Sequence, residues 1–405
     1  MKQQTKFKQT EIGMIPEDWE VDIWGSFIKL ITYGFTCPMP TTEEGPFMIT
    51  AKDLEGNKIN YDSARRTSKE AFNNNLTDKS RPIKNDILLS KDGTLGRVAI
   101  VKNENLCISQ SVALLRPSDK VLPQFLNYLL LAPQYQKKME SDAGGSVLKH
   151  IYITRVDKMI VAIPQLPEQS AIAKILSDLD SKIELNHKTK QNLEAIGLAL
   201  FNKWFNIDNF SEDWETKPLD KIAEYLNGLP LQKYPAGEEE EYLPVIKIRE
   251  LRNGLSDQTE KANLDIPEEY IVEDGDVLFS WSGTLEVEIW TNGKGALNQH
   301  LFKVSSNEYP KWFYYYWTKH FLRKFRHIAK GKATTMGHIQ RHNLTESEVI
   351  IPDKKAFENM NKIMSPIVER LITINLESRN LERIRDLLLP KLMSGKLRVP
   401  VEVRA

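Results

Sequence analysis

No residue pattern in this sequence matches an established type of catalytic site. The chain lacks a Gly-x-Gly-x-x-Gly motif for a nucleotide cofactor, a His-Glu-x-x-His motif for zinc, and the Pro-Pro dipeptide that amino-methyltransferase loops require. The two cysteines, Cys37 and Cys107, provide neither zinc-ligand spacing nor a disulfide framework. The seven histidines form no ligand cluster by spacing. These absences favour a protein that binds and assembles over one that catalyses.

Two loops, each present twice, could instead contact a nucleic acid. The first loop spans residues 90–97 and recurs at 280–287, and the second spans 144–150 and recurs at 331–338. Lysine, arginine and small polar side chains suit phosphates, and glycines allow a backbone to approach a duplex closely. An ordinary hairpin turn is the alternative for the first loop.

Amide side chains at two probable strand ends extend this candidate set, because asparagine and glutamine suit adenine edges. Buried turn amides are the alternative for these positions. The candidate DNA contacts are Lys52, Lys91, Thr94, Arg97, Ser109, Gln110, Ser146, Lys149, His150, Lys247, Arg249, Trp281, Asn298, Gln299, His300, Lys332, Thr334, Thr335, His338 and Gln340.

The paired loops belong to an internal duplication of the whole chain. Trp19 matches Trp214 at an offset of 195 residues, and Ser90 matches Ser280 at an offset of 190. Later matches keep an offset of 188. Loops of different length in a shared fold explain an offset that shrinks and then stays constant. The sequence therefore predicts one unit of about 190 residues that occurs twice.

Each copy opens with a segment that mixes strands, turns and helices. Residues 86–90 and 98–101 read as strands around a turn, and residues 276–280 repeat the first of them. Residues 122–139 and 310–328 read as helices. We therefore predict a compact α/β domain at the start of each copy.

Each copy then continues into one long helix. Pro167 near its start and apolar residues at steps of three and four predict a helix of about 38 residues, roughly 57 Å long. The apolar series has a polar gap at Asn186 and Lys190. One small domain cannot bury such a helix, so we expect antiparallel pairing with its counterpart in a pseudo-twofold arrangement. The alternative is a single amphipathic helix packed on its own domain.

The predicted seam between the helices consists of equivalent apolar residues from both copies. Its members are Ile175, Leu179, Ile183, Leu193, Ile196, Leu200, Ile363, Ile367, Leu371, Leu381, Ile384 and Leu388.

The even charge balance, 55 basic against 55 acidic residues, hides a strong asymmetry. Residues 51–160 carry a net charge of +6, whereas residues 211–290 carry −13. Residues 311–345 then contain eight lysines and arginines and no acid. Basic blocks suit a polyanion, and an acidic segment suits a protein partner or simply solubility.

The aromatic run at residues 312–317 invites a base-stacking interpretation. Its residues align with Phe125, Tyr128 and Leu129 of the first copy at helical spacing, so we interpret the run mainly as helix core. Lys319, Arg323 and Arg326, further along the same helix, remain candidate phosphate contacts.

Taken together, these features resemble the specificity (S) subunits of type I restriction–modification systems, over nearly the whole chain. The resemblance begins at residues 12–20, Ile-Gly-Met-Ile-Pro-Glu-Asp-Trp-Glu, and continues through residues 86–96. It is strongest at residues 167–183, Pro-Glu-Gln-x-x-Ile-x-x-Ile-Leu-x-x-Leu-Asp-x-x-Ile, and ends at residues 388–397. Residues 353–357, Asp-Lys-Lys-Ala-Phe, depart from the Pro-Glu-Gln pattern at the start of the second helix.

The resemblance implies an α+β protein with two homologous target-recognition domains, residues 1–165 and 207–352, and helical spacers at 166–206 and 353–405. Each domain would read one half of a split site in double-stranded DNA. The helices would dock two methyltransferase subunits, and restriction (motor-nuclease) subunits would complete the complex. The chain itself would be non-catalytic and bind no cofactor, because S-adenosylmethionine would sit in the methyltransferase subunit.

Two other functions remain open on the sequence alone. One is a free-standing sequence-specific DNA-binding regulator with two tandem reading domains, and the other is a methyltransferase with degenerate motifs. The first residues have no signal-peptide core, and no apolar stretch is long enough for a membrane span. With two cysteines far apart, these features suit a cytoplasmic protein.

Overall fold

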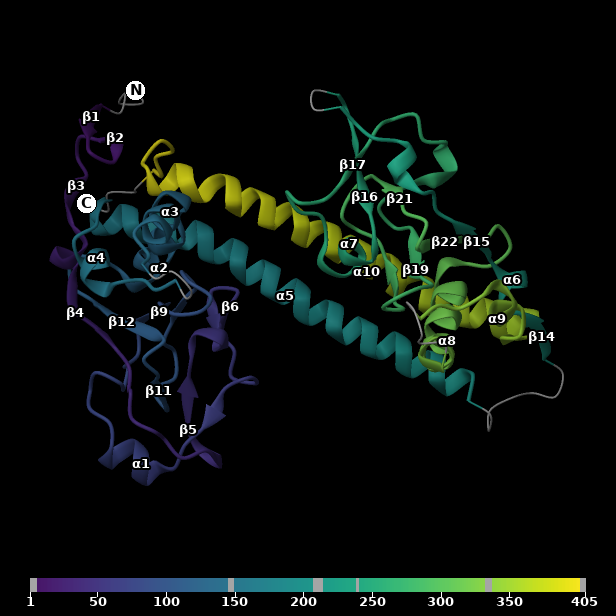
Figure 1. Cartoon of the computed structure of the whole chain (residues 1–405), viewed down its shortest axis with the longest axis horizontal. Coiled ribbons are helices and arrows are strands. Elements are labelled where there is room, and N and C mark those ends of the chain that lie inside the picture. Colours follow the sequence, from purple (N-terminus) through teal and green to yellow (C-terminus); the bar gives the residue numbers. More distant parts are fainter. Residues whose placement is uncertain (1–5, 145–148, 207–213, 238–239, 332–336, 401–405) are drawn as a thin grey trace. The chain divides into compact units, whose positions relative to one another are not determined.

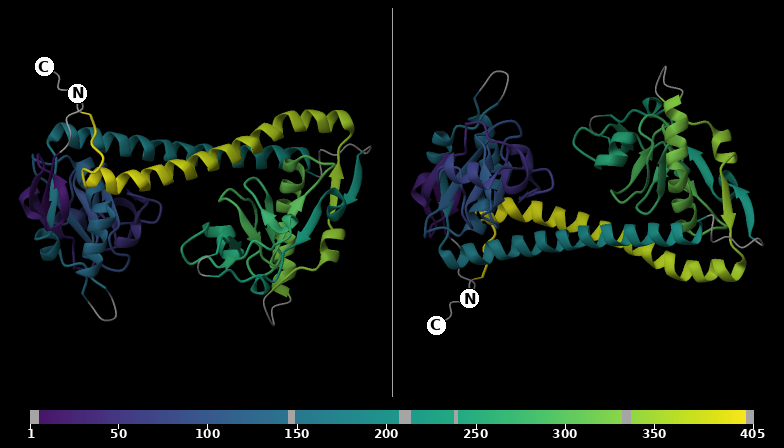
Figure 2. Two further views of the ribbon diagram at one scale, coloured as in Figure 1. Left: turned by 90° about the horizontal axis from the view of Figure 1, so that it is seen from above. Right: turned by 90° about the horizontal axis from the view of Figure 1, so that it is seen from below.

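The boundary between the two halves of this chain falls inside its long helices. The computed structural model describes residues 6–144, 149–206, 214–237, 240–331 and 337–400 (Figure 1). Unit 1 comprises Met1–Ser181 and Glu382–Ala405, and unit 2 comprises Lys182–Leu381. Each unit therefore contains part of both long helices (Figure 2).

Unit 1 is built on a four-stranded antiparallel sheet in the order β10-β9-β12-β4 and a three-stranded sheet in the order β11-β5-β8. Two hairpins, β1–β2 and β6–β7, and the antiparallel pair β3–β13 complete its strands. The bounds are β1 Phe7–Thr10, β2 Gly13–Pro16, β3 Glu20–Ile23, β4 Ile28–Tyr33, β5 Thr42–Ile49, β6 Leu54–Glu55, β7 Lys58–Ile59, β8 Arg65–Arg66, α1 Lys69–Asn74, β9 Ile87–Ser90, β10 Val98–Ile100, β11 Leu106–Ile108, β12 Val112–Pro117, α2 Pro123–Leu131, α3 Pro133–Ser141, α4 Ile153–Asp157 and β13 Ile160–Ile163.

Unit 2 repeats this design with sheets in the orders β15-β22-β19-β20 and β17-β16-β21-β18 and the antiparallel pair β14–β23. The bounds are β14 Glu215–Pro218, α6 Leu219–Ile222, β15 Glu224–Asn227, β16 Leu243–Ile246, α7 Ile248–Asn253, β17 Lys261–Ala262, β18 Ile271–Val272, β19 Val277–Ser280, β20 Val287–Ile289, β21 Gly295–Leu297, β22 Leu301–Ser305, α8 Lys311–Gly331, α9 Arg341–Thr345 and β23 Glu348–Ile351. Read in reverse, the order β20-β19-β22-β15 matches β10-β9-β12-β4 strand for strand, and β17-β16-β21 matches β8-β5-β11, which confirms the duplication. Strand β18 is an addition in unit 2.

The four-stranded sheet in each unit is buried on both faces, because side chains alternate along a strand. In β9, Ile87 and Leu89 pack with α2 in one core, whereas Leu88 packs in a second core with the strand β11. In β19, Phe279 and Leu278 divide in the same way between the two cores of unit 2. The predicted strands are therefore the central layer of each unit.

One predicted helix is wrong in its continuity. Residues 122–139 form two helices, α2 and α3, with Ala132 in an extended conformation between them (φ −64°, ψ 135°). Pro133 follows directly, and a proline disfavours helical geometry in the residue before it. The counterpart, α8, contains no proline and runs unbroken for 21 residues.

The long helices are α5, Leu166–Trp204, with 39 residues, and α10, Lys354–Met393, with 40 residues. At 1.5 Å per residue each is about 60 Å long. Within unit 1, Asp180 of α5 accepts a hydrogen bond from Arg385 of α10 at 3.0 Å. Within unit 2, Lys182 of α5 lies 3.2 Å from Glu377 of α10. In unit 1, Ile172 and Leu176, before Asp180 in α5, share a core with Leu392 and Met393, which come after Arg385 in α10. In unit 2, Phe201 near the end of α5 shares a core with Met360 and Met364 near the start of α10. In each unit the two helices therefore pair in antiparallel order, as predicted.

The seam differs in part from the predicted one. Ile196, Ile363 and Ile384 are 50%, 47% and 44% exposed, so their assignment to a buried seam is wrong. Ile183 and Leu371 are buried, and the other predicted members are partly buried. The buried positions include Ile172, Leu176, Ile183, Asn186, Met360, Met364, Val368, Leu371 and Ile374. An α-helix has 3.6 residues per turn, so a fixed stripe of apolar positions drifts around its surface by about 20° per heptad.

The polar gap of the seam is filled by a hydrogen bond. Asn186 is buried, and its amide nitrogen donates to Glu377 at 3.1 Å. Hydrogen bonds from Lys182 and Asn186 hold the pKa of the Glu377 carboxyl below its ordinary value. A buried amide with a matched partner fixes helix register at some cost in stability.

The segment after α10 is anchored on the N-terminal part of unit 1. Arg398 donates to Asp18 at 2.7 Å and to Glu168, at the start of α5, at 2.7 Å. The indole of Trp19 donates to Glu168 at 3.2 Å, so this buried carboxylate has two partners. We call this group the Arg398 latch.

Among the described residues, no helix combines the length and hydrophobicity that a bilayer span requires.

The Arg398 latch predicts a specific loss of stability. Arg398→Gln leaves the Glu168 carboxylate, whose side chain is 5% exposed, with the Trp19 indole as its remaining latch partner. We expect it to lower the free energy of unfolding of unit 1 by about 3 kcal/mol, the cost of breaking a buried ion pair. Urea unfolding followed by tryptophan fluorescence measures this change.

Asp18→Asn provides the matched control, because the Asp18 side chain is 57% exposed and an exposed pair contributes less than about 1 kcal/mol. Arg398 holds the pKa of Asp18 below its ordinary value of 3.8. The contribution of Asp18 is therefore present above pH 3.8, and it disappears as the pH falls through the lower folded-state pKa. Equal stability losses in the two variants at neutral pH would contradict this account.

Candidate DNA-recognition surface

Each unit carries one cluster of loops at the ends of its central strands. Loop cluster 1 comprises residues 33–35, 90–97, 108–111 and 149–151, and loop cluster 2 comprises residues 227–229, 280–286, 297–300 and 337–340. Three kinds of backbone contact hold both clusters together.

The first shared feature is a serine that closes the hairpin loop. Ser90 donates to the backbone oxygen of Thr94 at 2.5 Å and accepts from the backbone N–H of Arg97 at 2.8 Å. Ser280 closes its loop through Thr284 and Glu286 at 2.6 and 2.8 Å. The serine satisfies backbone groups that the strand ladder leaves unpaired, so both loops are closed in the same way although the loop of unit 1 is one residue longer.

The second feature joins the hairpin loop to the second predicted loop. Isolated antiparallel bridges connect Asp92 to His150 and Ser282 to His338. The backbone N–H of Ile151 donates to Lys91 at 2.9 Å, and that of Ile339 donates to Trp281 at 3.0 Å. The two loops that the sequence singles out in each copy are therefore neighbours in the fold.

The third feature is a close backbone approach that requires glycine. Parallel bridges join Phe35 to Ser109 and Leu229 to Asn298. A Cβ atom on Gly34 would lie 1.8 Å from the backbone oxygen of Ile108, and one on Gly228 would lie 2.3 Å from that of Asn298. Only a residue without a side chain fits these positions.

Loop cluster 1 presents a carboxylate between two nitrogen-bearing groups. Asp92 contacts the imidazole Nδ1 of His150 through one oxygen, and Lys91 Nζ lies 2.9 Å from the other. The Lys91 side chain is 8% exposed and lies over the ring of Tyr33. Lys91 is therefore packed inside the cluster, whereas the side chains of Asp92 and His150 are about one-third exposed. An accessible carboxylate can accept from the N4 amino group of cytosine.

Loop cluster 2 presents aromatic and imidazole groups at the same positions. The indole of Trp281 donates to Asn227 at 2.8 Å, and its ring lies near the rings of His300 and His338, at 6.0 and 6.3 Å. Ser282 pairs with His300 Nδ1 at 3.0 Å. Neutral imidazoles and hydroxyl groups both donate and accept hydrogen bonds. The two clusters thus share a frame but offer different recognition chemistry.

The amides at the turns divide into inward and outward groups. Asn298 is 2% exposed and accepts from the backbone N–H of His300 at 3.3 Å, so it is a buried turn amide rather than an accessible base contact. Ser109 pairs with Ser111 at 2.8 Å. Gln110 is exposed, and the side-chain oxygen of Gln299 is buried without a hydrogen-bond partner in the described part of the chain. Because that oxygen is buried, Gln110 is the more accessible of the two glutamine amides.

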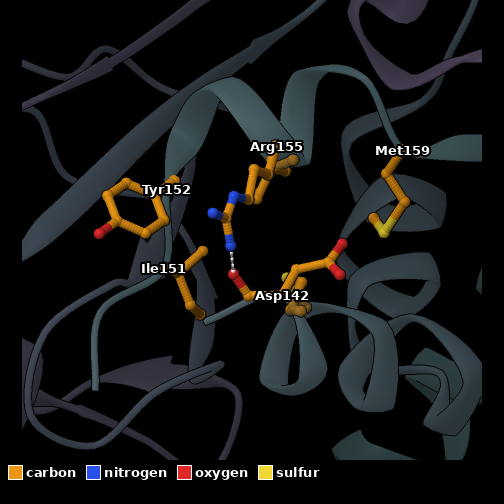
Figure 3. A pocket seen from close by; sticks show the side chains of 7 residues that line it. Asp142, Ile151, Tyr152, Arg155 and Met159 are labelled. Atoms are coloured by element: carbon orange, nitrogen blue, oxygen red, sulfur yellow. Dashed lines mark hydrogen bonds between the residues drawn. The ribbon is translucent and has the colours of Figure 1, made fainter. Parts of the chain in front are cut away.

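A small pocket lies beside loop cluster 1, where Arg155 crosses from α4 to the backbone oxygen of Asp142 (Figure 3). Its guanidinium also lies 4.6 Å from the centre of the half-exposed Tyr152 ring. Gly144 and His150 are joined by two backbone hydrogen bonds of 3.0 and 2.8 Å. These contacts hold Gly144 and His150 together at the edge of loop cluster 1.

Several predicted cations have intramolecular partners. Arg97 donates to the backbone oxygen of Leu54 at 2.9 Å, so it holds the hairpin loop in place. Lys247 and Arg249 pair with Glu260 and Glu250 at 2.5 and 2.7 Å. Lys149 lies 3.7 Å from Glu140. Lys52, Thr94 and Gln340 are exposed, whereas Ser146, Lys332, Thr334 and Thr335 lie outside the described residues.

The aromatic run of α8 is helix core, as predicted. All six residues from Trp312 to Trp317 are buried. Arg326 donates to the backbone oxygen of Leu285 at 2.9 Å, and Lys319 donates to the Tyr315 hydroxyl at 2.9 Å, so both stabilise the fold, whereas Arg323 is exposed.

Sequence reasoning missed Gly34 and Gly228, and also Asp92 and Ser282, which form the bridges between loops. The signal was present, because Gly34 and Gly228 follow the two matching strands β4 and β15 and precede Phe35 and Leu229.

Within the described ranges, no group of three or more His, Cys, Asp or Glu side chains is arranged to hold a metal ion.

Comparison with known proteins gives a consistent result. Residues 37–195 and 211–384 each match the family described as type I restriction modification DNA specificity domain. The type I restriction enzyme MjaIX specificity subunit of Methanocaldococcus jannaschii is 27% identical over 428 aligned positions, which cover 98% of this chain and 97% of the relative. The type I restriction enzyme HindI specificity subunit of Haemophilus influenzae is 23% identical over 78% of this chain and 87% of its own length.

A solved structure shares the fold. The crystal structure of the type I restriction–modification S subunit from M. genitalium superposes with a TM-score of 0.61 and 19% identity. The match covers 96% of this chain and 99% of that one. Two tandem matches to one family model, over most of the sequence, show that this chain belongs to the type I restriction–modification DNA specificity family.

Proposed function

We propose that this chain is the subunit that selects the DNA target of a type I restriction–modification complex. Loop cluster 1 reads one half of a bipartite site in double-stranded DNA, and loop cluster 2 reads the other half. The observation that carries this proposal is that loop clusters 1 and 2 share the same backbone contacts but carry different side chains at their tips. Two such readers recognise two unlike half-sites.

The long helices serve as the spacer and as the docking site for two methyltransferase subunits. The names of the relatives, which call them specificity subunits of type I restriction enzymes, support a place in a complex of several subunits. Restriction subunits join this assembly. The chain has no catalytic role, and S-adenosylmethionine is bound by the methyltransferase subunit, which flips its target adenine out of the duplex. A near-neutral chain with basic segments suits a protein that grips DNA as one part of a larger complex.

The direct test is to co-express the chain with its methyltransferase subunits and map methylated adenines across a genome. We expect the methyltransferase to co-purify and to modify a split motif only when this chain is present. A free-standing regulator would bind DNA alone and leave the methylation pattern unchanged, and that outcome would contradict the proposal. A methyltransferase would modify DNA without a partner.

A second test alters the two readers separately. Gln110→Ala and Gln299→Ala remove equivalent side-chain amides, while the backbone N–H groups still donate to Phe35 and Leu229. We expect each variant to relax one base position, by about 1–3 kcal/mol, in one half-site only, because a lost amide contact removes discrimination at its own base. Methylation assays on substrates with single base changes measure this effect. If both variants relax the same half-site, the assignment of one reader to each half is wrong.

A further inference from the structure

A carboxylate of α5 joins both long helices of unit 1 to its recognition domain. Asp180 Oδ2 accepts from the Tyr128 hydroxyl at 2.7 Å and from the Asn57 amide at 3.4 Å. Its other oxygen accepts from Arg385 of α10 at 3.0 Å. We call these four residues, with Asn127, the Asp180 hub.

The hub is built to be rigid. Tyr128 is 6% exposed on α2, and burial with the nearby Asp180 raises the pKa of its hydroxyl, which therefore stays protonated and donates. Asn57 has a φ of +64°, a left-handed conformation that asparagine tolerates better than most residues. Its side-chain oxygen accepts from the buried Asn127 at 2.5 Å. Each hub side chain therefore makes at least one hydrogen bond, although the side-chain oxygen of Asn127 is buried without a partner among the described residues.

The hub connects directly to the loop that reads DNA. Asn57 lies at the turn between β6 and β7, and the backbone oxygen of Leu54 in β6 accepts from Arg97 at 2.9 Å. The backbone of Arg97 in turn closes the hairpin loop through Ser90. A short series of hydrogen bonds and one tight hairpin thus leads from the helix pair to loop cluster 1.

Unit 2 makes its junction differently. A cavity of about 400 Å³ separates the helices from β20, and its lining includes Lys190, Glu194, Glu288 and Asn375. Arg379 of α10 donates to Asp274 at 2.9 Å and also to the backbone oxygen of Thr291, a residue that lines this cavity. In these contacts Arg379 joins α10 to the domain, whereas Asp180 in unit 1 joins both helices to the domain.

We propose that Asp180 is a positioning residue that holds loop cluster 1 at a fixed place on the helix pair and thereby sets how strictly the gap between half-sites is selected. This inference rests on the proposed function. A reader that can shift on its spacer tolerates gaps of other lengths, whereas a rigid one selects a single gap. Asp180 touches no DNA base in this account and acts through Asn57, Leu54 and Arg97.

Asp180→Asn tests the proposal, because the amide keeps the size of the side chain but cannot accept from all three donors at once. The complex with methyltransferase subunits is assayed on DNA with the native gap and with gaps one base pair shorter and longer. We expect the ratio of the native rate to the altered-gap rates to fall about tenfold, the usual effect of losing a charged hydrogen bond.

Asp178→Asn is the matched control. It lies two residues away on the same helix, removes the same charge, and breaks only an exposed pair with Lys174 at 2.5 Å. We expect its gap ratio to equal that of the wild type. Tyr128→Phe and Asn57→Gly reach the hub while Asp180 stays in place, and glycine accepts the positive φ of residue 57. Both should lower the gap ratio as well.

The outcomes separate the two proposals. A gap ratio in Asp180→Asn within about twofold of the wild type overturns the role of the hub. An equal loss of methylation at all gaps also overturns it, because that result indicates a purely structural role. If the wild-type complex shows no methylation that depends on this chain, the proposed function itself fails. A lower ratio in the three hub variants, with Asp178→Asn unchanged, supports the hub.

Discussion

A helix of about 40 residues exposes more apolar surface than one small domain can cover, and this constraint governs the whole chain. Each long helix is completed by the other, and every unit contains part of both. The first and last segments of the chain therefore meet in unit 1, where Arg398 joins Asp18 and Glu168. In unit 2, the buried amide of Asn186 meets Glu377 of the opposite helix. The duplicated sequence thus contains two long helices that each need their apolar side covered. The two helices cover part of one another in both units.

Given this scaffold, the reading surfaces can diverge without loss of fold. Backbone bonds through Ser90 and Ser280, and close approaches at Gly34 and Gly228, fix the loop clusters regardless of which side chains stand at their tips. Under the proposed function, specificity and stability would therefore depend on different residues within one cluster. At equivalent positions the tips carry Lys91, Asp92 and His150 in unit 1, and Trp281, Ser282 and His338 in unit 2.

Much of the architecture could be predicted from sequence because it depends on periodicity and repetition. The strands predicted at residues 86–90, 98–101 and 276–280 and both long helices follow from apolar spacing and turn residues. The core role of residues 312–317 follows from their match to the first copy at helical spacing. The proline break before α3 was visible as Pro133 but was outweighed by the apolar pattern around it. The exposure of Ile196, Ile363 and Ile384 was not visible, because small errors in helical phase accumulate over many turns.

The site was less predictable than the fold. Sequence patterns identified loops that lie next to one another in the fold. They could not show that Arg97 donates to a backbone oxygen, that the Lys91 side chain is buried, or that Asn298 is a buried amide. These outcomes depend on contacts between segments far apart in the chain. The Asp180 hub illustrates the same limit, since it joins Asn57, Tyr128 and Arg385 across more than 300 residues of sequence.

The central claim is that one chain carries two separate readers on a common frame, and a chimera tests it most directly. Strand pairs of matching register, Glu20 with Ile163 and Glu215 with Ile351, bound the two recognition domains. Residues 215–351 can therefore be replaced by a second copy of residues 20–163, and the methylated motif of the resulting complex can be mapped. This account predicts a symmetric motif with the first half-site repeated in opposite orientation. A folded, complex-forming chimera that still modifies the original second half-site would contradict it.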